Sequence, residues 1–196
     1  MMNFFHQIPL LLKVTRSSNI ARRYFVVNGF DGALTMLGII VGFHQAGNTA
    51  IPVVLAACLG AAIALGVSGL SSAYISEAAE RRVELQTLES AMITDLGDTA
   101  HGRAAQIIPF LIAMVNGLAP LLISLVIITP LWWPELFTAL SINVLEASIA
   151  IALVIIFMMG VFLGKVSGHF WLFSGVRTLL VALVTAAIIM FFSPGG

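Results

Sequence analysis

YFVVNGFDGALTMLGIIVGFH occupies residues 24–44 and carries a single acidic side chain, Asp31. At about 1.5 Å per residue, this apolar stretch is long enough to cross the ~30 Å hydrocarbon core of a bilayer. Asp31 lies about seven residues, or ~10 Å, into the stretch. An acidic side chain at membrane depth is costly, and it usually belongs to an ion pathway, a proton relay or a buried ion pair. Asp31 is therefore the first candidate functional residue.

The composition is that of a membrane protein. The chain has 196 residues, of which 60% are hydrophobic and 9% are charged, whereas soluble domains carry about 25% charged residues. Nine Lys and Arg balance nine Asp and Glu, so there is no excess positive charge for binding nucleic acid. The single cysteine, Cys58, cannot form a disulfide within the chain.

The sequence predicts an all-α integral membrane protein with five transmembrane helices. Each of five apolar segments has the ~20 residues that a spanning helix needs; they are residues 24–46, 51–75, 106–128, 137–162 and 171–192. Residues 1–23 are too short and too polar to span, and they form either an interfacial amphipathic helix or a disordered tail. The membrane domain is expected to cover residues 24–196.

The basic residues predict the orientation. All nine lie before the first segment, between the second and third, or around the connection between the fourth and fifth, and the other two loops contain none. The positive-inside rule then places the N-terminus in the cytoplasm and the C-terminus outside. No helix breaker lies between the end of segment 51–75 and Glu77, so the second helix is expected to extend into the cytoplasm at the start of the polar segment 76–105.

Small residues recur at four-residue spacing in Gly38-x-x-x-Gly42, Gly160-x-x-x-Gly164 and Gly164-x-x-x-Gly168. Such patterns allow close approach of helix backbones. They indicate either packing within one protomer or a homodimer contact.

Three glutamates form the most regular polar pattern in the chain. Glu77, Glu80 and Glu84 are spaced i, i+3, i+7, which at about 100° per residue places them on one face of a helix. Carboxylates suit Fe²⁺, Mn²⁺ or Mg²⁺ better than they suit soft metals, so these three residues are predicted metal ligands. The alternative is a solvated helix in which Glu77 pairs with Arg81 at i, i+4.

Further polar residues are candidates for accessory or pathway roles. Asp95, Asp98 and His101 lie at three-residue intervals, and with Glu89 they are candidate accessory ligands; Gly97 and Gly102 favour a turn or cap role instead. Three more are assigned to a proton or cation pathway, namely Asn28, Asn116 and Glu146. For Asn116 the alternative is an interhelical hydrogen bond. Asp31 and Glu146 have no Lys or Arg at membrane depth, so each is either protonated or faces water or a cation.

No pattern typical of an enzyme is present. The sequence contains no Gly-rich phosphate loop, His-Glu-x-x-His motif or nucleophile elbow. The serines of segment 51–75 have no histidine at membrane depth to activate them. We therefore expect neither an enzyme nor a bound cofactor.

The first segment resembles the opening of the vacuolar iron transporter family, whose members have five spans. Asp31-Gly32-Ala33-Leu34, followed by Gly38 and Gly42, matches the family's Asp-Gly opening. Tyr74, Ser76, Arg81 and Glu84 resemble the end of the family's second span and the polar helix after it. Similar features in the last two spans are Gly164-Lys165 and Ser174 to Arg177.

The resemblance implies a dimeric transporter that exchanges Fe²⁺ or a related divalent ion against protons. The family's span-one Asp corresponds to Asp31. Its span-two Met and Glu correspond to Gly69 and Ala73, so these two ligands are absent, and the cytoplasmic region is shorter than the family's metal-binding domain. Glu77, one turn beyond Ala73, is the candidate replacement. The chain resembles a divergent, shortened prokaryotic branch of the family.

The leading hypothesis is therefore a homodimeric Fe²⁺ or Mn²⁺ transporter of a prokaryotic cell membrane, which exports the ion from the cytoplasm by proton exchange. Two alternatives remain open: a membrane scaffold or assembly subunit, and a transporter of a small organic solute with the same fold.

Overall fold

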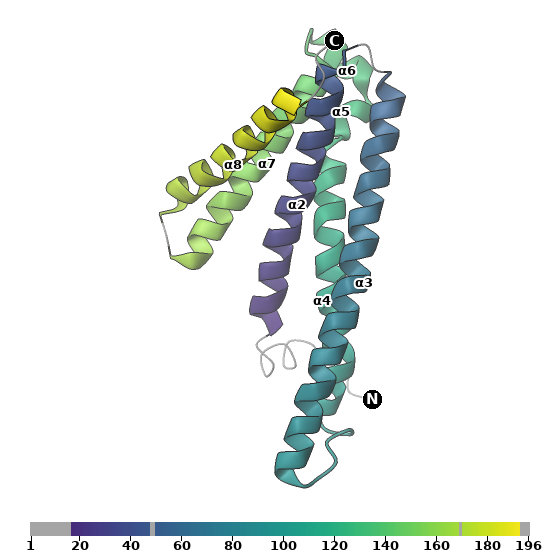
Figure 1. Ribbon diagram of the computed structural model, residues 1–196, viewed down its shortest axis with the longest axis vertical. Coiled ribbons are helices and arrows are strands. Elements are labelled where there is room, and N and C mark those ends of the chain that lie inside the picture. Colours follow the sequence, from purple (N-terminus) through teal and green to yellow (C-terminus); the bar gives the residue numbers. More distant parts are fainter. Residues whose placement is uncertain (1–16, 48–49, 169, 193–196) are drawn as a thin grey trace. The chain divides into compact units, whose positions relative to one another are not determined.

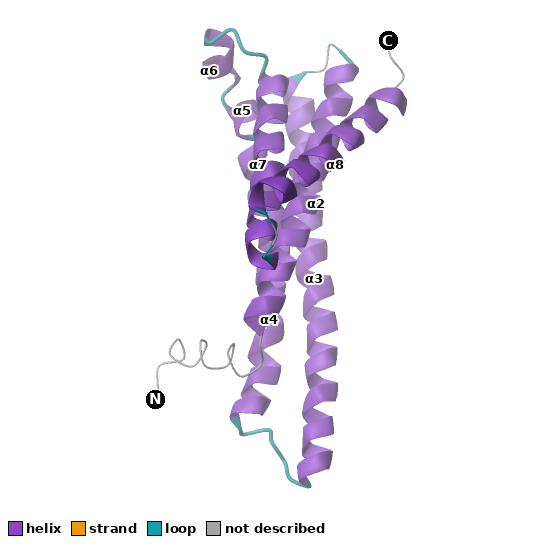
Figure 2. Cartoon of the chain, turned by 90° about the vertical axis from the view of Figure 1, so that its left-hand side faces the viewer, coloured by secondary structure: helices purple, strands orange, loops and turns teal. Residues whose placement is uncertain are grey.

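A computed structural model describes residues 17–47, 50–168 and 170–192. These residues form helices joined by short loops, with no β-strand among them (Figures 1 and 2). The helices are α2 (Ser17–Gln45), α3 (Ile51–Met92), α4 (Ala100–Ile127), α5 (Thr129–Trp132), α6 (Pro134–Ala139), α7 (Val144–Ser167) and α8 (Trp171–Phe192). Residues 1–16 of the N-terminal segment, for which the sequence allows either an interfacial helix or a disordered tail, lie outside the described residues.

Within the part of the chain that the structure describes, five helices are long and apolar enough to cross a membrane, as the sequence predicts. These segments are Ala21–Gln45, Ile51–Met92, Ala100–Ile127, Val144–Ser167 and Trp171–Phe192. The chain is therefore an all-helical protein suited to a lipid bilayer. Helix α3 continues without a break past residue 75 to Met92, in agreement with the absence of a helix breaker there.

The fourth segment differs from its predicted bounds of 137–162. Helix α6 ends at Ala139, and α7 begins only at Val144. Asn143 is the N-cap of α7, and its side chain accepts a hydrogen bond from the Leu145 backbone N–H at 2.9 Å. Ser141, just before the cap, has φ of 56°, a left-handed conformation that interrupts a helix.

The chain forms two compact units, which we describe separately. Unit 1 contains the described residues up to Phe25 together with Gly66–Leu118. In it, the second half of α3 packs closely on the first part of α4. An added Cβ at Gly117 would lie 2.8 Å from the Leu70 Cβ, so a larger side chain at this position would push the two helices apart. Apolar packing continues along α4 through Ile108 and Ile112, which are fully buried.

Unit 2 contains Val26–Leu65 and the residues from Ala119 onward. Its core brings together side chains from α2, α3, α4 and α7, including Met36, Ile40, Cys58, Ile127 and Ile156, all fully buried. Helices α7 and α8 run antiparallel as neighbours (Figure 1).

Small residues make the contact between α7 and α8. An added Cβ at Gly160 would lie 2.8 Å from the Ser174 carbonyl oxygen, and one at Gly164 would lie 3.0 Å from the Trp171 Cα. The Gly160-x-x-x-Gly164 pattern therefore serves packing within the protomer. Gly168 has a different role, because with φ of 71° it is the left-handed C-cap of α7.

Candidate functional site

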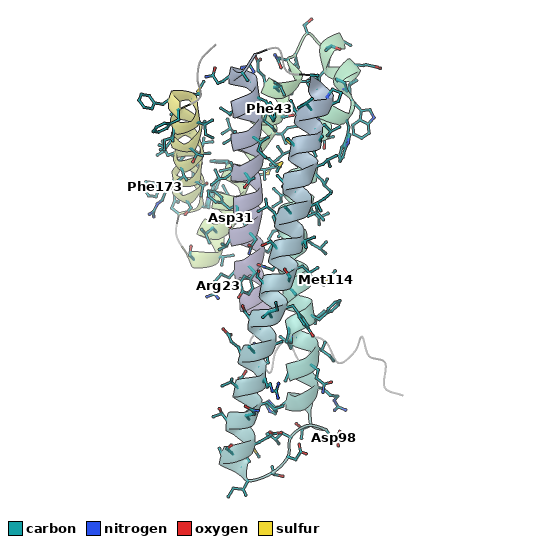
Figure 3. All side chains as sticks on the ribbon, turned by 45° about the vertical axis from the view of Figure 1, so that its right-hand side comes forward. Arg23, Asp31, Phe43, Asp98, Met114 and Phe173 are labelled. Atoms are coloured by element: carbon teal, nitrogen blue, oxygen red, sulfur yellow. The ribbon has the colours of Figure 1, made fainter. Side chains whose placement is uncertain are left out.

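Asp31 lies on α2 with an exposed side chain (Figure 3). Its carboxylate forms no ion pair with a described residue. The side chain borders a groove of about 190 Å³, which is lined by Val26, Val27, Phe30, Asp31, Met159, Leu163 and Thr178. The lining is otherwise almost entirely apolar, so Asp31 is the one ionisable group in this groove.

Two glycines of α2 explain how Asp31 comes to face outward. An added Cβ at Gly32 would lie 2.8 Å from the Pro120 backbone of α4, and one at Gly29 would lie 2.9 Å from the Met159 side chain of α7. These close contacts fix one face of α2 against its neighbours in unit 2. Asn28, one turn before Asp31, is half-buried. Gly32, the glycine of the Asp-Gly pair, is thus a packing residue, whereas the side chain of Asp31 remains exposed.

Glu77 is the one acidic side chain that is buried within the described part of the chain, at 3% exposure. The Tyr24 hydroxyl donates a hydrogen bond to Glu77 Oε1 at 3.4 Å. The other oxygen, Oε2, accepts no hydrogen bond from a described residue and lies 3.9 Å from the Arg81 Nη2. A buried carboxylate needs such a neighbour, because desolvation disfavours its charged form.

Arg81 also binds Glu84, with an Nη1 to Oε2 distance of 2.7 Å. Glu84 itself is exposed, as is Glu80. The row of three glutamates is therefore interrupted by a guanidinium group that contacts two of its members. Of the two sequence interpretations, the pairing of Glu77 with Arg81 is the one that the structure contains.

Asn116 makes the interhelical hydrogen bond that was its alternative interpretation. Its side-chain amide, in α4, donates to the Gly69 carbonyl oxygen in α3 at 2.5 Å. An added Cβ at Gly69 would lie 3.0 Å from the Asn116 carbonyl oxygen. Ala73, one turn further, is buried at 4% exposure. Gly69 is therefore closed by packing against α4, and Ala73 is buried; these are the two positions at which the family resemblance implies a Met and a Glu.

The accessory candidates between α3 and α4 stabilise a turn. Glu89 Oε1 accepts a hydrogen bond from the Leu96 N–H at 3.1 Å, and Asp95 Oδ1 accepts one from the Gly97 N–H at 2.8 Å. Asp98 is exposed in the same turn. The contacts of Glu89 and Asp95 are those that the turn interpretation predicts.

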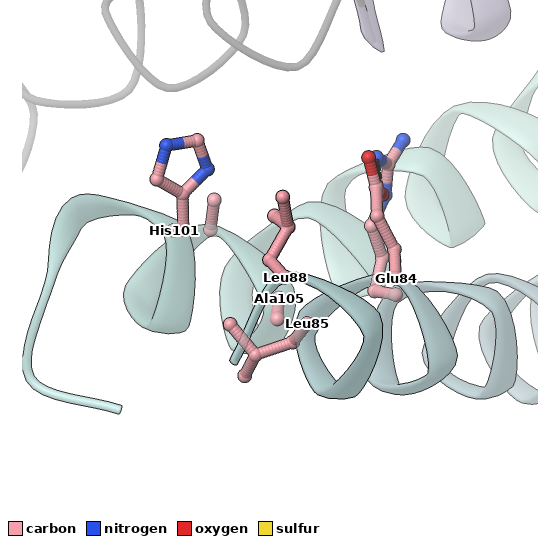
Figure 4. A pocket seen from close by; sticks show the side chains of 7 residues that line it. Glu84, Leu85, Leu88, His101 and Ala105 are labelled. Carbon is pink, nitrogen blue, oxygen red and sulfur yellow. Dashed lines mark hydrogen bonds and ion pairs between the residues drawn. The ribbon is translucent and has the colours of Figure 1, made fainter. Parts of the chain in front are cut away.

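His101, in α4, borders a small pocket of about 20 Å³ together with Glu84. Figure 4 shows the two side chains at opposite ends of the group, with Leu88 and Ala105 between them. They do not converge on one point. Across the described residues, no three His, Cys, Asp or Glu side chains are grouped so that they could hold a metal ion.

Glu146 lies nearer to the start of its helix than the predicted segment 137–162 implied. Because α7 begins at Val144, Glu146 is its third residue, and its side chain is exposed. A carboxylate in the first turn of a helix is favourably placed relative to the helix dipole. Interaction with the dipole of α7 is therefore a structural role for Glu146.

Two contributors were missed by the sequence interpretation. Met159 shares the groove of Asp31, and Tyr24 binds Glu77. Both belong to helices distant in sequence from their partners. The sequence offered one indication of this, because Tyr24 carries a hydroxyl group at the start of the first apolar stretch.

Comparisons with known proteins identify a relative but no function. No family model matches the chain, and no solved structure matches it. An uncharacterized protein of Methanocaldococcus jannaschii is similar to it, with 28% identity over 188 residues, which are 93% of this chain and 95% of the relative. The similarity therefore extends over nearly the whole of both chains.

Proposed function

We propose that the protein is a multi-pass membrane transporter, not an enzyme, that moves Fe²⁺ or Mn²⁺ out of the cytoplasm in exchange for protons. The observation that carries the proposal is Asp31, an exposed carboxylate on an apolar helix, beside a groove and without a cationic partner among the described residues. Ionisable residues inside membrane spans usually mark ion or proton pathways.

The depth of Asp31 supports this role. The apolar stretch of α2 begins at Tyr24, after Arg22 and Arg23, so Asp31 is seven residues, or about 10 Å, into it. That is about a third of a ~30 Å hydrocarbon core. A bare carboxylate there is costly unless it holds a proton or a cation. Alternation between those two states is what cation–proton exchange requires.

The proposed ligand set differs from the one that the family resemblance implies. The positions of the family's Met and Glu hold Gly69 and Ala73, which carry no ligand atom in their side chains, but Met159 brings a thioether to the same groove as Asp31. A thioether with a carboxylate suits a borderline ion such as Fe²⁺ better than it suits Mg²⁺. Glu80 and Glu84 are the exposed carboxylates that would gather cations at the cytoplasmic mouth.

The proposal includes a homodimer in a prokaryotic cell membrane, with the N-terminus in the cytoplasm and the C-terminus outside. Asp31 and Gly42 lie within about 20° of each other around α2, and an added Cβ at Gly42 would meet no atom within 4 Å. A second copy packed on this face would shield Asp31 from lipid. Replacing Gly42 by Leu should then weaken association, whereas Gly60→Leu, at another open glycine on α3, should not.

A flux assay tests the transport role. The full chain is reconstituted in liposomes that contain a metal-quenched dye and a pH indicator, and Mn²⁺ or Fe²⁺ uptake is followed under a pH gradient. Asp31→Asn should abolish both metal movement and the accompanying proton movement. The matched control is Asp98→Asn, at an exposed turn. Wild-type flux in the Asp31 variant would exclude the proposed role of this residue.

A scaffold or assembly subunit is the second candidate. The end of α3 exposes Met92 and Ile93 at 61% and 92%, as a contact surface for another protein would. In that case liposomes should show no metal flux with the wild-type chain. Solute transport is the third possibility, because the Asp31 groove has largely apolar walls. A thermal-shift screen that compares metals with small organic solutes distinguishes it from metal transport.

A further inference from the structure

A second groove lies between α7 and α8, with a volume of about 700 Å³. Its walls are apolar and come from both helices, for example Phe157, Met158 and Val161 from α7 and Trp171 and Leu179 from α8. The volume falls within the range of about 300–1,000 Å³ that is typical of small-molecule sites. None of the residues in the proposed cation pathway lines this groove.

A basic residue, Lys165, follows the α7 residues that line the groove, although it is not itself part of the lining. Lys165 is in the last turn of α7 and is exposed. At about 100° per residue it lies within about 20° of Met158 and 40° of Val161 around the helix, so it continues their face. Lys165 forms no ion pair with any residue that the structure describes. Trp171, at the same end, is 45% exposed.

We propose that this groove binds an anionic phospholipid, with an acyl chain along α7 and α8 and the headgroup phosphate on Lys165. An apolar channel with a lysine at one end matches the two chemical parts of such a lipid. Tryptophan favours the headgroup level of a membrane, and basic pockets between helices bind anionic headgroups.

A second copy of the chain is a less suitable occupant. None of the nine acidic residues lies in α8, or in α7 beyond Glu146. The ends of these helices near Lys165 would therefore offer it no carboxylate from a second copy. The lipid phosphate supplies the charge that the protein lacks here.

Quenching of Trp171 by brominated lipids tests the proposal. The chain has three tryptophans, so Trp132→Phe and Trp133→Phe leave Trp171 as the only reporter. The full chain is titrated in mixed micelles with phosphatidylglycerol or phosphatidylcholine that carries bromine on the acyl chain. A lysine beside an anionic headgroup gives roughly a fivefold preference, so half-maximal quenching should need about five times less brominated phosphatidylglycerol.

Lys165→Ala should remove this preference, and Lys165→Arg should keep it. The matched control is Arg177→Ala, which removes a basic residue of α8 that lies about 120° around the helix from Trp171. Equal quenching by both lipids in the wild type would overturn the proposal and indicate ordinary lipid contact. So would equal loss of preference in the Lys165 and Arg177 alanine variants, because the effect would then follow overall charge.

Discussion

Replacement of Arg81 by methionine tests whether Glu77 is a structural or a transport residue. Methionine keeps much of the length of arginine but removes the charge. Glu77 would then remain buried at 3% exposure, with the Tyr24 hydroxyl as its one hydrogen-bond donor among the described residues. No cation would be left within 4 Å of it among those residues.

The expected loss of stability follows from this geometry. Removal of one partner from a buried ion pair costs about 3–5 kcal/mol. We expect the lower end, about 3 kcal/mol, because the Arg81 Nη2 to Glu77 Oε2 distance is long at 3.9 Å. Arg81 also pairs with Glu84, whose side chain is 60% exposed, and that contact should contribute less than about 1 kcal/mol.

The assay is equilibrium unfolding of the purified chain in mixed micelles, followed by circular dichroism. A double-mutant cycle compares Arg81→Met, Glu77→Gln and the double variant. Arg81→Met should lower the free energy of unfolding by about 3 kcal/mol, and the separate variant Glu84→Gln should lower it by less than about 1 kcal/mol. Addition of Glu77→Gln to Arg81→Met should restore about 2 kcal/mol, since no buried charge then lacks a partner.

Two results would refute this reasoning. One is an Arg81→Met cost no larger than that of Glu84→Gln. The other is a Glu77→Gln variant that unfolds like the wild type but has lost metal flux in liposomes. That second result would show that Glu77 is a transport ligand, and that its contact with Arg81 is incidental.

Three further substitutions test the packing and the helix ends by the same unfolding measurement. Gly160→Ala should destabilise the chain by about 1–3 kcal/mol, because its Cβ would meet the backbone of α8; Gly60→Ala, where the space is open, should cause no loss. Asn143→Ala removes the N-cap of α7 and should cost about 1 kcal/mol; an unchanged midpoint would contradict the capping role. Ile93 has φ of 53° and is exposed, so Ile93→Gly should stabilise the chain by about 1 kcal/mol.

The sequence predicted the helices well where hydropathy and helix breakers agree. Helix α8 begins and ends at the predicted residues 171 and 192. The predicted start of the fourth span, at residue 137, was wrong, because residues 137–142 are mostly apolar and resemble the helix that follows in hydropathy. The interruption depends on the left-handed backbone of Ser141 and on the Asn143 cap. Neither residue type by itself distinguishes a helix start from a polar position within a helix.

For the candidate site, the predictions that agree with the structure are local ones. The i, i+4 spacing of Glu77 and Arg81 was sufficient to suggest their pairing, which the structure contains. By contrast, Tyr24 reaches Glu77 from 53 residues away in the sequence. No periodic pattern in one helix can identify such a contact, because it depends on how the helices pack.

Cys58, fully buried in the core of unit 2, is the only thiol in the chain. A thiol reagent can therefore modify the wild-type protein only when that core opens. The rate of modification is a direct kinetic measure of local unfolding, obtained without any engineered label. A cysteine introduced at an exposed position would react before Cys58 does, so the side of the membrane on which each loop lies can be mapped without first removing the native residue.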